Sequence, residues 1–78
     1  MRRPVVMPDL GVPGAKVSVW FVRPGERLRE GERLVEILAG SAAVDIPSPA
    51  DGILVQRLVE IDQSVVAGQT LGFVDDAI

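Results

Sequence analysis

Short apolar runs separated by prolines and glycines recur along the whole chain. The run from Lys16 to Val22 alternates between polar and apolar residues and then becomes continuously apolar, which is typical of a strand with one buried end. The next four residues, Arg23-Pro24-Gly25-Glu26, have the composition of a turn. The whole pattern predicts eight short strands, at residues 4–8, 17–22, 26–29, 34–38, 43–46, 53–60, 64–66 and 70–75. Short strands at this spacing predict an all-β fold, a sandwich or a barrel.

The segment from Glu26 to Leu38 is ambiguous by itself, because its apolar positions would also suit one face of a helix. An internal repeat favours strands. A shift of 37 residues places Val22 on Val59, Gly31 on Gly68 and Leu34 on Leu71. The second copy, residues 63–74, contains several β-branched residues and two glycines, so it is a poor helix former. We therefore expect two short strands, interrupted at Gly31, in the first copy as well.

The repeat also predicts an internal pseudo-twofold. The same shift places the strand before residue 41 onto residues 71–75 and the strand after it onto residues 5–9. The two chain ends should therefore meet in neighbouring strands, at the end of the domain opposite Ser41. In that arrangement Arg2 and Arg3 would lie near Asp75 and Asp76.

Composition narrows the possible functions. Residues 1–78 are expected to form one small domain, with 47% apolar residues for its core. The chain has no Cys and no His, so Cys-His and Ser-His-Asp catalysis and an ordinary zinc site are excluded, and we expect no enzyme and no metal site. A net charge of −3 argues against a nucleic-acid surface. No apolar run approaches the roughly 18 residues of a membrane span, and we expect a cytoplasmic protein.

The stretch Leu38-Ala39-Gly40-Ser41-Ala42-Ala43 lies between two apolar runs, residues 34–37 and 44–46. Small residues and one Gly suit the tip of a tight β-hairpin. We therefore expect residue 41 at an exposed turn.

Five segments in order give the chain a resemblance to a known family. They are Val6-Met7-Pro8-Asp9-Leu10-Gly11, Val19-Trp20-Phe21-Val22-Arg23-Pro24-Gly25-Glu26, Gly31-Glu32-Arg33-Leu34-Val35-Glu36-Ile37, Ile46-Pro47-Ser48-Pro49-Ala50-Asp51-Gly52 and Val66-Ala67-Gly68-Gln69-Thr70-Leu71. Together they resemble the lipoyl domain of 2-oxo acid dehydrogenase dihydrolipoamide acyltransferases, in the biotin/lipoyl attachment family. The Met-Lys-Met tip of biotin carriers is absent. The resemblance implies a flattened barrel of two four-stranded antiparallel sheets, in which a ligase attaches lipoate to a lysine at the hairpin tip.

In this sequence the lysine's place is taken by Ser41, between Gly40 and Ala42. A serine hydroxyl cannot form the lipoyl amide, so we expect no lipoate on this chain, although lipoate is the cofactor that the resemblance implies. Leu38 stands where the family has an acidic residue. The resemblance implies dehydrogenase-complex components or lipoate ligase as partners, no membrane partner and a monomeric isolated domain. The chain would then be a non-lipoylated binding or structural module.

Two other readings remain open. One is a barrel-sandwich adaptor unit of the membrane-fusion type, which also lacks the lysine but inserts a long coiled coil at the tip. The other is a carrier modified elsewhere, for which only Lys16 or the N-terminal amine could supply the nitrogen. Ser41 as a nucleophile is disfavoured, because no His is present as a base.

Several other residues are interpreted structurally. Asp45, Asp51 and Asp62 are expected in separate turns rather than at a calcium site. The mixed-charge run of residues 23–36 is expected to be a solvated face, with docking of an acidic or basic partner as the functional alternative. In the second predicted strand, Phe21 is expected in the core. Trp20 is expected to be partly exposed, where it could anchor a contact.

Overall fold

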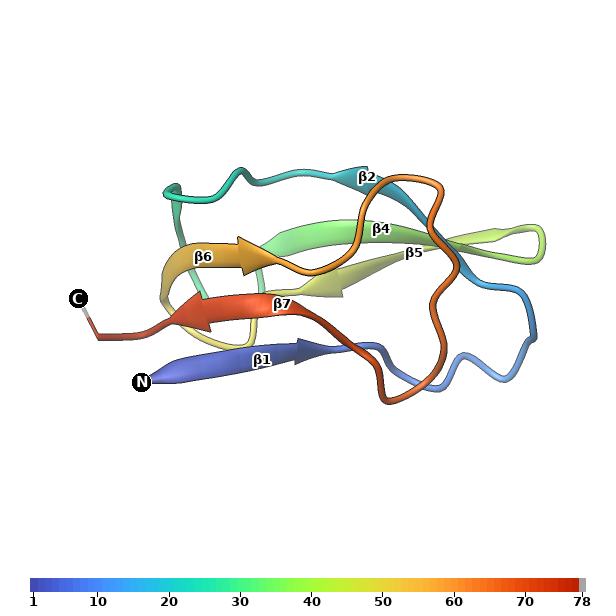
Figure 1. The fold of residues 1–78 in the computed structure, drawn as a ribbon, viewed down its shortest axis with the longest axis horizontal. Helices are drawn as coiled ribbons and strands as arrows, with labels where there is room; N and C mark the ends of the chain where they lie inside the picture. Colours follow the sequence, from blue (N-terminus) through green and yellow to red (C-terminus); the bar gives the residue numbers. More distant parts are fainter. Residues whose placement is uncertain (78) are drawn as a thin grey trace.

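The computed structural model describes residues 1–77 and contains seven strands. Their bounds are β1 (Arg2–Val6), β2 (Lys16–Trp20), β3 (Arg27–Leu28), β4 (Arg33–Ala39), β5 (Ala42–Pro47), β6 (Gly52–Arg57) and β7 (Thr70–Asp75). They form two antiparallel sheets, one in the order β1-β7-β6-β3 and the other in the order β2-β4-β5. Figure 1 shows the β4–β5 hairpin projecting at one end and both termini at the other. The described residues include no helix long and apolar enough to cross a membrane.

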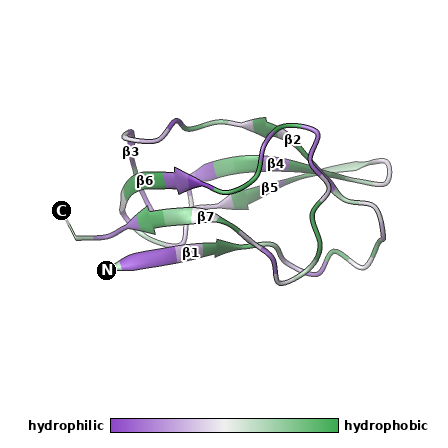
Figure 2. Ribbon diagram, viewed as in Figure 1, coloured by the Kyte–Doolittle hydropathy of each residue, from purple (hydrophilic) through white to green (hydrophobic). Residues whose placement is uncertain are grey.

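The core lies between the two sheets, because alternate residues of the strands point inward. Figure 2 shows apolar segments in β4, β7 and the first half of β6, and polar residues at the start of β1. The side chains with almost no exposed surface are Val5, Val17, Leu34, Val35, Ile37, Leu54, Val59, Leu71 and Val74. These residues come from both copies of the repeat, so each copy contributes half of one shared core.

The predicted pseudo-twofold is confirmed in detail by the strand registers. In β2–β4, Val17 pairs with Ile37, and a bulge follows before Val19. In β6–β7, Leu54 pairs with Val74, and a bulge follows before Gln56. A shift of 37 residues relates the first set to the second, bulge included. An irregularity reproduced at the same place in both halves shows that the two copies have the same backbone.

The turns repeat in the same way. Gly25 donates its backbone N–H to the carbonyl of Leu54 at 2.7 Å, and Asp62, its counterpart, donates to Val17 at 2.8 Å. Gly25 has a φ of 94° and Asp62 a φ of 71°, so both occupy the left-handed region that favours glycine. Within residues 1–77, Asp62 alone combines a side chain with a positive φ.

The termini meet as predicted. Arg2 lies opposite Asp75 in the β1–β7 ladder, and Arg3 Nε is 2.7 Å from a carboxylate oxygen of Asp76. The Asp76 N–H also donates to the carbonyl of Met1. The ends of the chain are therefore held together by backbone pairing as well as by charge.

One predicted strand is missing from the structure. The strand expected at residues 64–66 is reduced to one bridge between Ser64 and Lys16, the counterpart of the pairing of Arg27 with Ile53 in the two-residue β3. The second sheet therefore has three strands rather than four. Because this pairing spans only two residues even in the first copy, the loss of one pair removes the strand.

The repeat predicted that the strand after residue 41 corresponds to residues 5–9, and this register is wrong. Val5 pairs with Gly72 as Ile46 pairs with Val35, so β1 and β5 correspond through a shift of 41. The reason is a difference in loop length. Between equivalent paired residues, the chain is four residues longer from Val6 to Lys16 than from Pro47 to Ile53.

Candidate functional site at the hairpin tip

A two-residue turn joins β4 to β5. Ala39 pairs with Ala42, and Gly40 and Ser41 form the turn, both exposed to solvent. Gly40 has a φ of 64°, while Ser41 does not have a positive φ. A glycine with positive φ at the first central position is what a type II′ turn requires, and this turn matches the twist of paired strands. Residue 41 is thus presented at the end of a rigid hairpin (Figure 1).

The remaining residues of the predicted tip belong to the strands. Ala39 is buried, Ala42 and Ala43 are exposed, and Leu38 is half-buried. Leu38 faces outward as predicted from alternation with the buried Ile37, and it lies between Ala43 on β5 and Lys16 on β2. The apolar spot at Leu38 is therefore partly covered by its neighbours.

The tip has little chemistry of its own. No charged residue occurs from Ile37 to Val44. Within the described chain the hydroxyl of Ser41 makes no hydrogen bond. A serine becomes nucleophilic only beside a base that takes its proton, and nothing of that kind lies in the turn. The hydroxyl is exposed but not activated.

Two amines could replace a tip lysine, and neither lies in the turn. Lys16 is opposite Leu38 in the ladder, three residues short of Ser41, and its Nζ is 3.9 Å from an oxygen of Asp62. The N-terminal amine is at the opposite end of the barrel, 2.9 Å from Asp76. The hydrogen bond to Asp76 is the main reason why the pKa of this amine is raised, and the raised pKa disfavours the neutral form that acylation needs.

The other predicted site residues have structural partners. Asp45 lies within β5 rather than in a turn, because the tip hairpin continues to Pro47, and it is 3.9 Å from Arg33. The Asp51 carboxylate accepts the backbone N–H of Glu30 at 2.7 Å. Among residues 1–77 no three acidic side chains come together in a way that could hold a metal ion.

Of the two aromatic residues expected in the second predicted strand, Trp20 agrees with its prediction and Phe21 agrees only in part. Trp20 is half-buried as predicted, and its indole N–H donates to the carbonyl of Val59 at 3.0 Å. Phe21 is only half-buried, with the Arg33 guanidinium 4.2 Å above its ring. Phe21 packs against the core without being buried in it, and the neighbouring Val22 takes the buried position.

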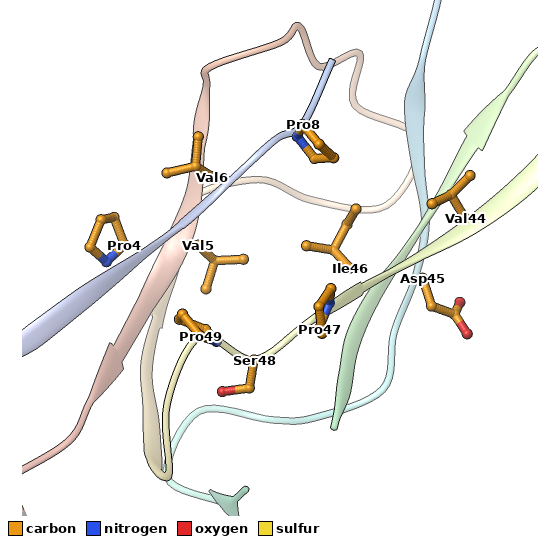
Figure 3. Close-up of a pocket in the computed structure, with 10 residues that line it drawn as sticks. All are labelled: Pro4, Val5, Val6, Pro8, Val44, Asp45, Ile46, Pro47, Ser48 and Pro49. Atoms are coloured by element: carbon orange, nitrogen blue, oxygen red, sulfur yellow. The ribbon is translucent and has the colours of Figure 1, made fainter. Parts of the chain in front are cut away.

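A groove between β1 and β5 was not predicted from the sequence. Its volume is about 410 Å³, and Figure 3 shows Val5 and Ile46 between the two edge strands, with prolines along both. Four prolines line it, Pro4, Pro8, Pro47 and Pro49. Proline cannot donate to a β-ladder, so these residues protect both edges against pairing with another strand. The clustering of four of the six prolines at these two edges was the available sequence signal.

Comparisons with known proteins agree with this geometry. The family model described as "Biotin-requiring enzyme", which covers biotin and lipoyl attachment, matches residues 3–74. The dihydrolipoyllysine-residue succinyltransferase component of the 2-oxoglutarate dehydrogenase complex of Escherichia coli K12 is 36% identical over 70 residues, 87% of this chain and 17% of that protein. The dihydrolipoyllysine-residue acetyltransferase component of the pyruvate dehydrogenase complex of Bacillus subtilis is 33% identical over 67 residues, 83% of this chain and 15% of that protein.

The fold has a solved counterpart. The lipoyl domain of the 2-oxoglutarate dehydrogenase complex from Azotobacter vinelandii superimposes with a TM-score of 0.72, covering 91% of this chain and 95% of that domain at 21% identity. The all-β fold of two antiparallel sheets is thereby confirmed as the lipoyl-domain fold. The chain spans only about a sixth of the length of the two transferases.

Proposed function

Because the chain belongs to the biotin/lipoyl attachment domain family, we propose that it is a lipoyl-type module of a 2-oxo acid dehydrogenase acyltransferase that carries no lipoate. Such a module acts by binding or by spacing other parts of a complex, and it has no catalytic activity of its own. Its partners would be components of the dehydrogenase complex. The isolated domain is expected to be monomeric and cytoplasmic.

The observation that carries the proposal is the chemistry at the turn. Attachment of lipoate as an amide consumes a primary amine, and the exposed turn offers a serine hydroxyl at residue 41. The hairpin itself is intact, with the Ala39–Ala42 pair closing a two-residue turn. The barrel therefore keeps a tip that can be recognised while lacking the atom to be acylated.

The membrane-fusion alternative has less support. Adaptor units of that type resemble this fold but insert a long coiled coil at the tip, whereas two residues close this hairpin. The other alternative is a carrier that is modified at Lys16. It is supported only by the exposure of this side chain, which is 50% exposed on β2, the strand beside β4. Its position in a strand keeps the amine away from the turn.

Lipoylation in vitro tests the proposal. The chain is incubated with a lipoate ligase, lipoate and ATP, and its intact mass is measured. We expect no adduct on the unchanged chain, and one lipoyl group on the double variant Gly40→Asp with Ser41→Lys. The matched control Gly40→Asp with Ser41→Arg restores positive charge without a primary amine and should stay unmodified.

The outcomes separate the alternatives. An adduct on the unchanged chain that disappears with Lys16→Arg would replace the proposal by a carrier modified at Lys16. Failure of the lysine variant to accept lipoate would show that the ligase no longer recognises this barrel. That result would remove lipoate ligase from the proposed partners.

A further inference from the structure

The charged segment from Arg23 to Arg33 has a counterpart with few charged residues, and no basic ones, in the other half of the barrel. The first segment contains four arginines and three glutamates, whereas residues 60–70, which follow the same backbone path, contain one Glu and one Asp. Gly31 and Gly68 even share a φ of 85°. Because the second copy forms the same turns with two charged residues in place of seven, the backbone does not require the extra charges of the first copy.

Acidic side chains in and beside the charged segment accept backbone hydrogen bonds, and neutral side chains can also accept such bonds. A Glu32 oxygen accepts the N–H of Arg29 at 3.3 Å, and in the other half a Gln69 oxygen accepts the N–H of Val66 at 3.0 Å. The carboxylate of Asp51 accepts the N–H of Glu30. Each of these two carboxylates therefore accepts one backbone hydrogen bond.

Two arginines of the segment, Arg27 and Arg29, form no such internal interaction among the described side chains. Arg3, Arg33 and Arg57 each form an ion pair, but Arg27 and Arg29 form none within the described residues. Both are exposed, and they flank Leu28, which is buried, so alternation directs the two guanidinium groups to the same outer side of the edge strand β3.

Together they line an open groove. Its volume is about 390 Å³, and Leu28, Glu32 and Asp51 complete its walls. The four charged residues of these walls correspond through the repeat to Gly14, Ser64, Val66 and Gln69, which carry no charge. Charged side chains therefore line this groove, whereas the equivalent positions of the repeat have none.

We propose that this groove, the Arg27–Arg29 groove, is a docking site for an acidic segment of a partner protein. A guanidinium presents donors in a fork that matches a carboxylate, so two carboxylates of one extended segment can each pair with one arginine. Glu32 and Asp51 repel a compact multivalent anion such as phosphate more than two separated single charges, which favours a peptide. Figure 2 places β3 at the end of the barrel that holds the termini, away from the tip, so this site does not depend on what residue 41 carries.

Nuclear magnetic resonance titration tests this site. The probe is the blocked tetrapeptide acetyl-Glu-Glu-Glu-Glu-amide, with the glutamine analogue as a control, added to the isotope-labelled chain at low ionic strength. We expect the amide signals of residues 27–32 and 51 to shift with the glutamate peptide only. Raising the salt to about 0.5 M should weaken binding several-fold, because exposed pairs are screened.

Two double variants with the same change in net charge separate this groove from general electrostatics. Arg27→Gln with Arg29→Gln should weaken binding by about tenfold, since two exposed ion pairs are lost. Arg2→Gln with Lys16→Gln should weaken it less than twofold. Transplanting the pair as Ser64→Arg with Val66→Arg should create a second set of shifting amides around residues 64–69.

The proposal is overturned if the unchanged chain shows no shifts, or if the shifts are spread over all basic residues. Equal weakening by the two glutamine variants would also overturn it, because binding would then follow net charge alone. Retained dispersion of the amide signals shows for each variant that the barrel is folded.

Discussion

The two halves of the barrel are residues 15–47 and residues 52–76 together with residues 1–6. Their repeated parts, residues 15–38 and 52–75, share a backbone while differing on the surface. The shared positions are inside: Val17 and Leu54, like Leu34 and Leu71, have no exposed surface. The outer positions differ, as in the ladder where Glu36 faces Asp45 in one sheet and Phe73 faces Pro4 in the other. The fold depends on what the halves share, and the candidate partner surfaces lie where they differ.

The two halves also differ at their ends, although the strands that lead to these ends are equivalent. In one half the pair Ala39–Ala42 is closed by the Gly40–Ser41 turn. At the equivalent place in the other half lie the chain termini, joined by the hydrogen bond from Asp76 to Met1. The exposed tip is therefore formed by one half alone, although the strands leading to it have counterparts.

The largest expected effect tests the equivalence of the two halves in the core. Leu34→Ala and Leu71→Ala should each lower the free energy of unfolding by about 2–5 kcal/mol, because each removes a fully buried side chain and leaves a cavity. Urea unfolding followed by circular dichroism measures both. Val19→Ala, at an exposed position, is the control and should cost less than about 1 kcal/mol. A loss near zero for one leucine variant alone would contradict the equivalence.

A smaller effect is expected where the halves differ inside. Gly52 corresponds to Ala15, but a Cβ at Gly52 would overlap the backbone carbonyl of Asp75. Gly52→Ala should therefore destabilise the barrel by about 1–3 kcal/mol through displacement of β7. Ala15→Gly loses one buried methyl group and gains chain flexibility, at a cost of about 1–2 kcal/mol. Thermal unfolding of both variants gives the order, and a neutral Gly52→Ala would show that β7 adapts freely.

The turn before β3 and its counterpart provide a smaller test. Gly25→Ala places a side chain at a φ of 94° and should cost about 1 kcal/mol, since the left-handed region is unfavourable for a residue with a Cβ. Asp62→Gly relieves the same strain and should raise stability by up to about 1 kcal/mol. The unfolding midpoints in urea should therefore move in opposite directions. Movement in the same direction would mean that the two turns are not equivalent in energy.

Much of the fold could be predicted because the sequence contains two copies of the same structural pattern. The helix suggested by residues 26–38 is excluded by the glycines and β-branched residues of the second copy. The position of Ser41 in an exposed turn follows from small residues between two apolar runs, a local signal. The burial of Leu34 and Leu71 follows from the repeat in the same way.

Features that depend on distant contacts were not predictable. The register of β1 depends on the length of the loop before β2, which the repeat does not contain. The half-buried position of Phe21 beneath Arg33 and the groove at Val5 and Ile46, between strands of different sheets, both depend on such contacts. The Arg27–Arg29 groove was visible only as a mixed-charge run, because the sequence does not show which charges are paired.

The smallest expected effect concerns the joined termini, where charge adds to backbone pairing. The hydrogen bond from Arg3 is the main reason why the pKa of Asp76 lies below its ordinary value of 3.8. A carboxyl group with a lowered folded pKa stabilises the fold above its unfolded pKa, and this stabilisation disappears as the pH falls below 3.8 through the folded value. Arg3→Gln should raise the pKa of Asp76, measured from its side-chain carbonyl shift during acid titration. Arg2→Gln, whose side chain forms no ion pair within residues 1–77, should leave the pKa of Asp76 in place. An unchanged pKa in Arg3→Gln would contradict the role of Arg3 and leave the N-terminal amine, 2.9 Å from Asp76, as the charge that lowers it.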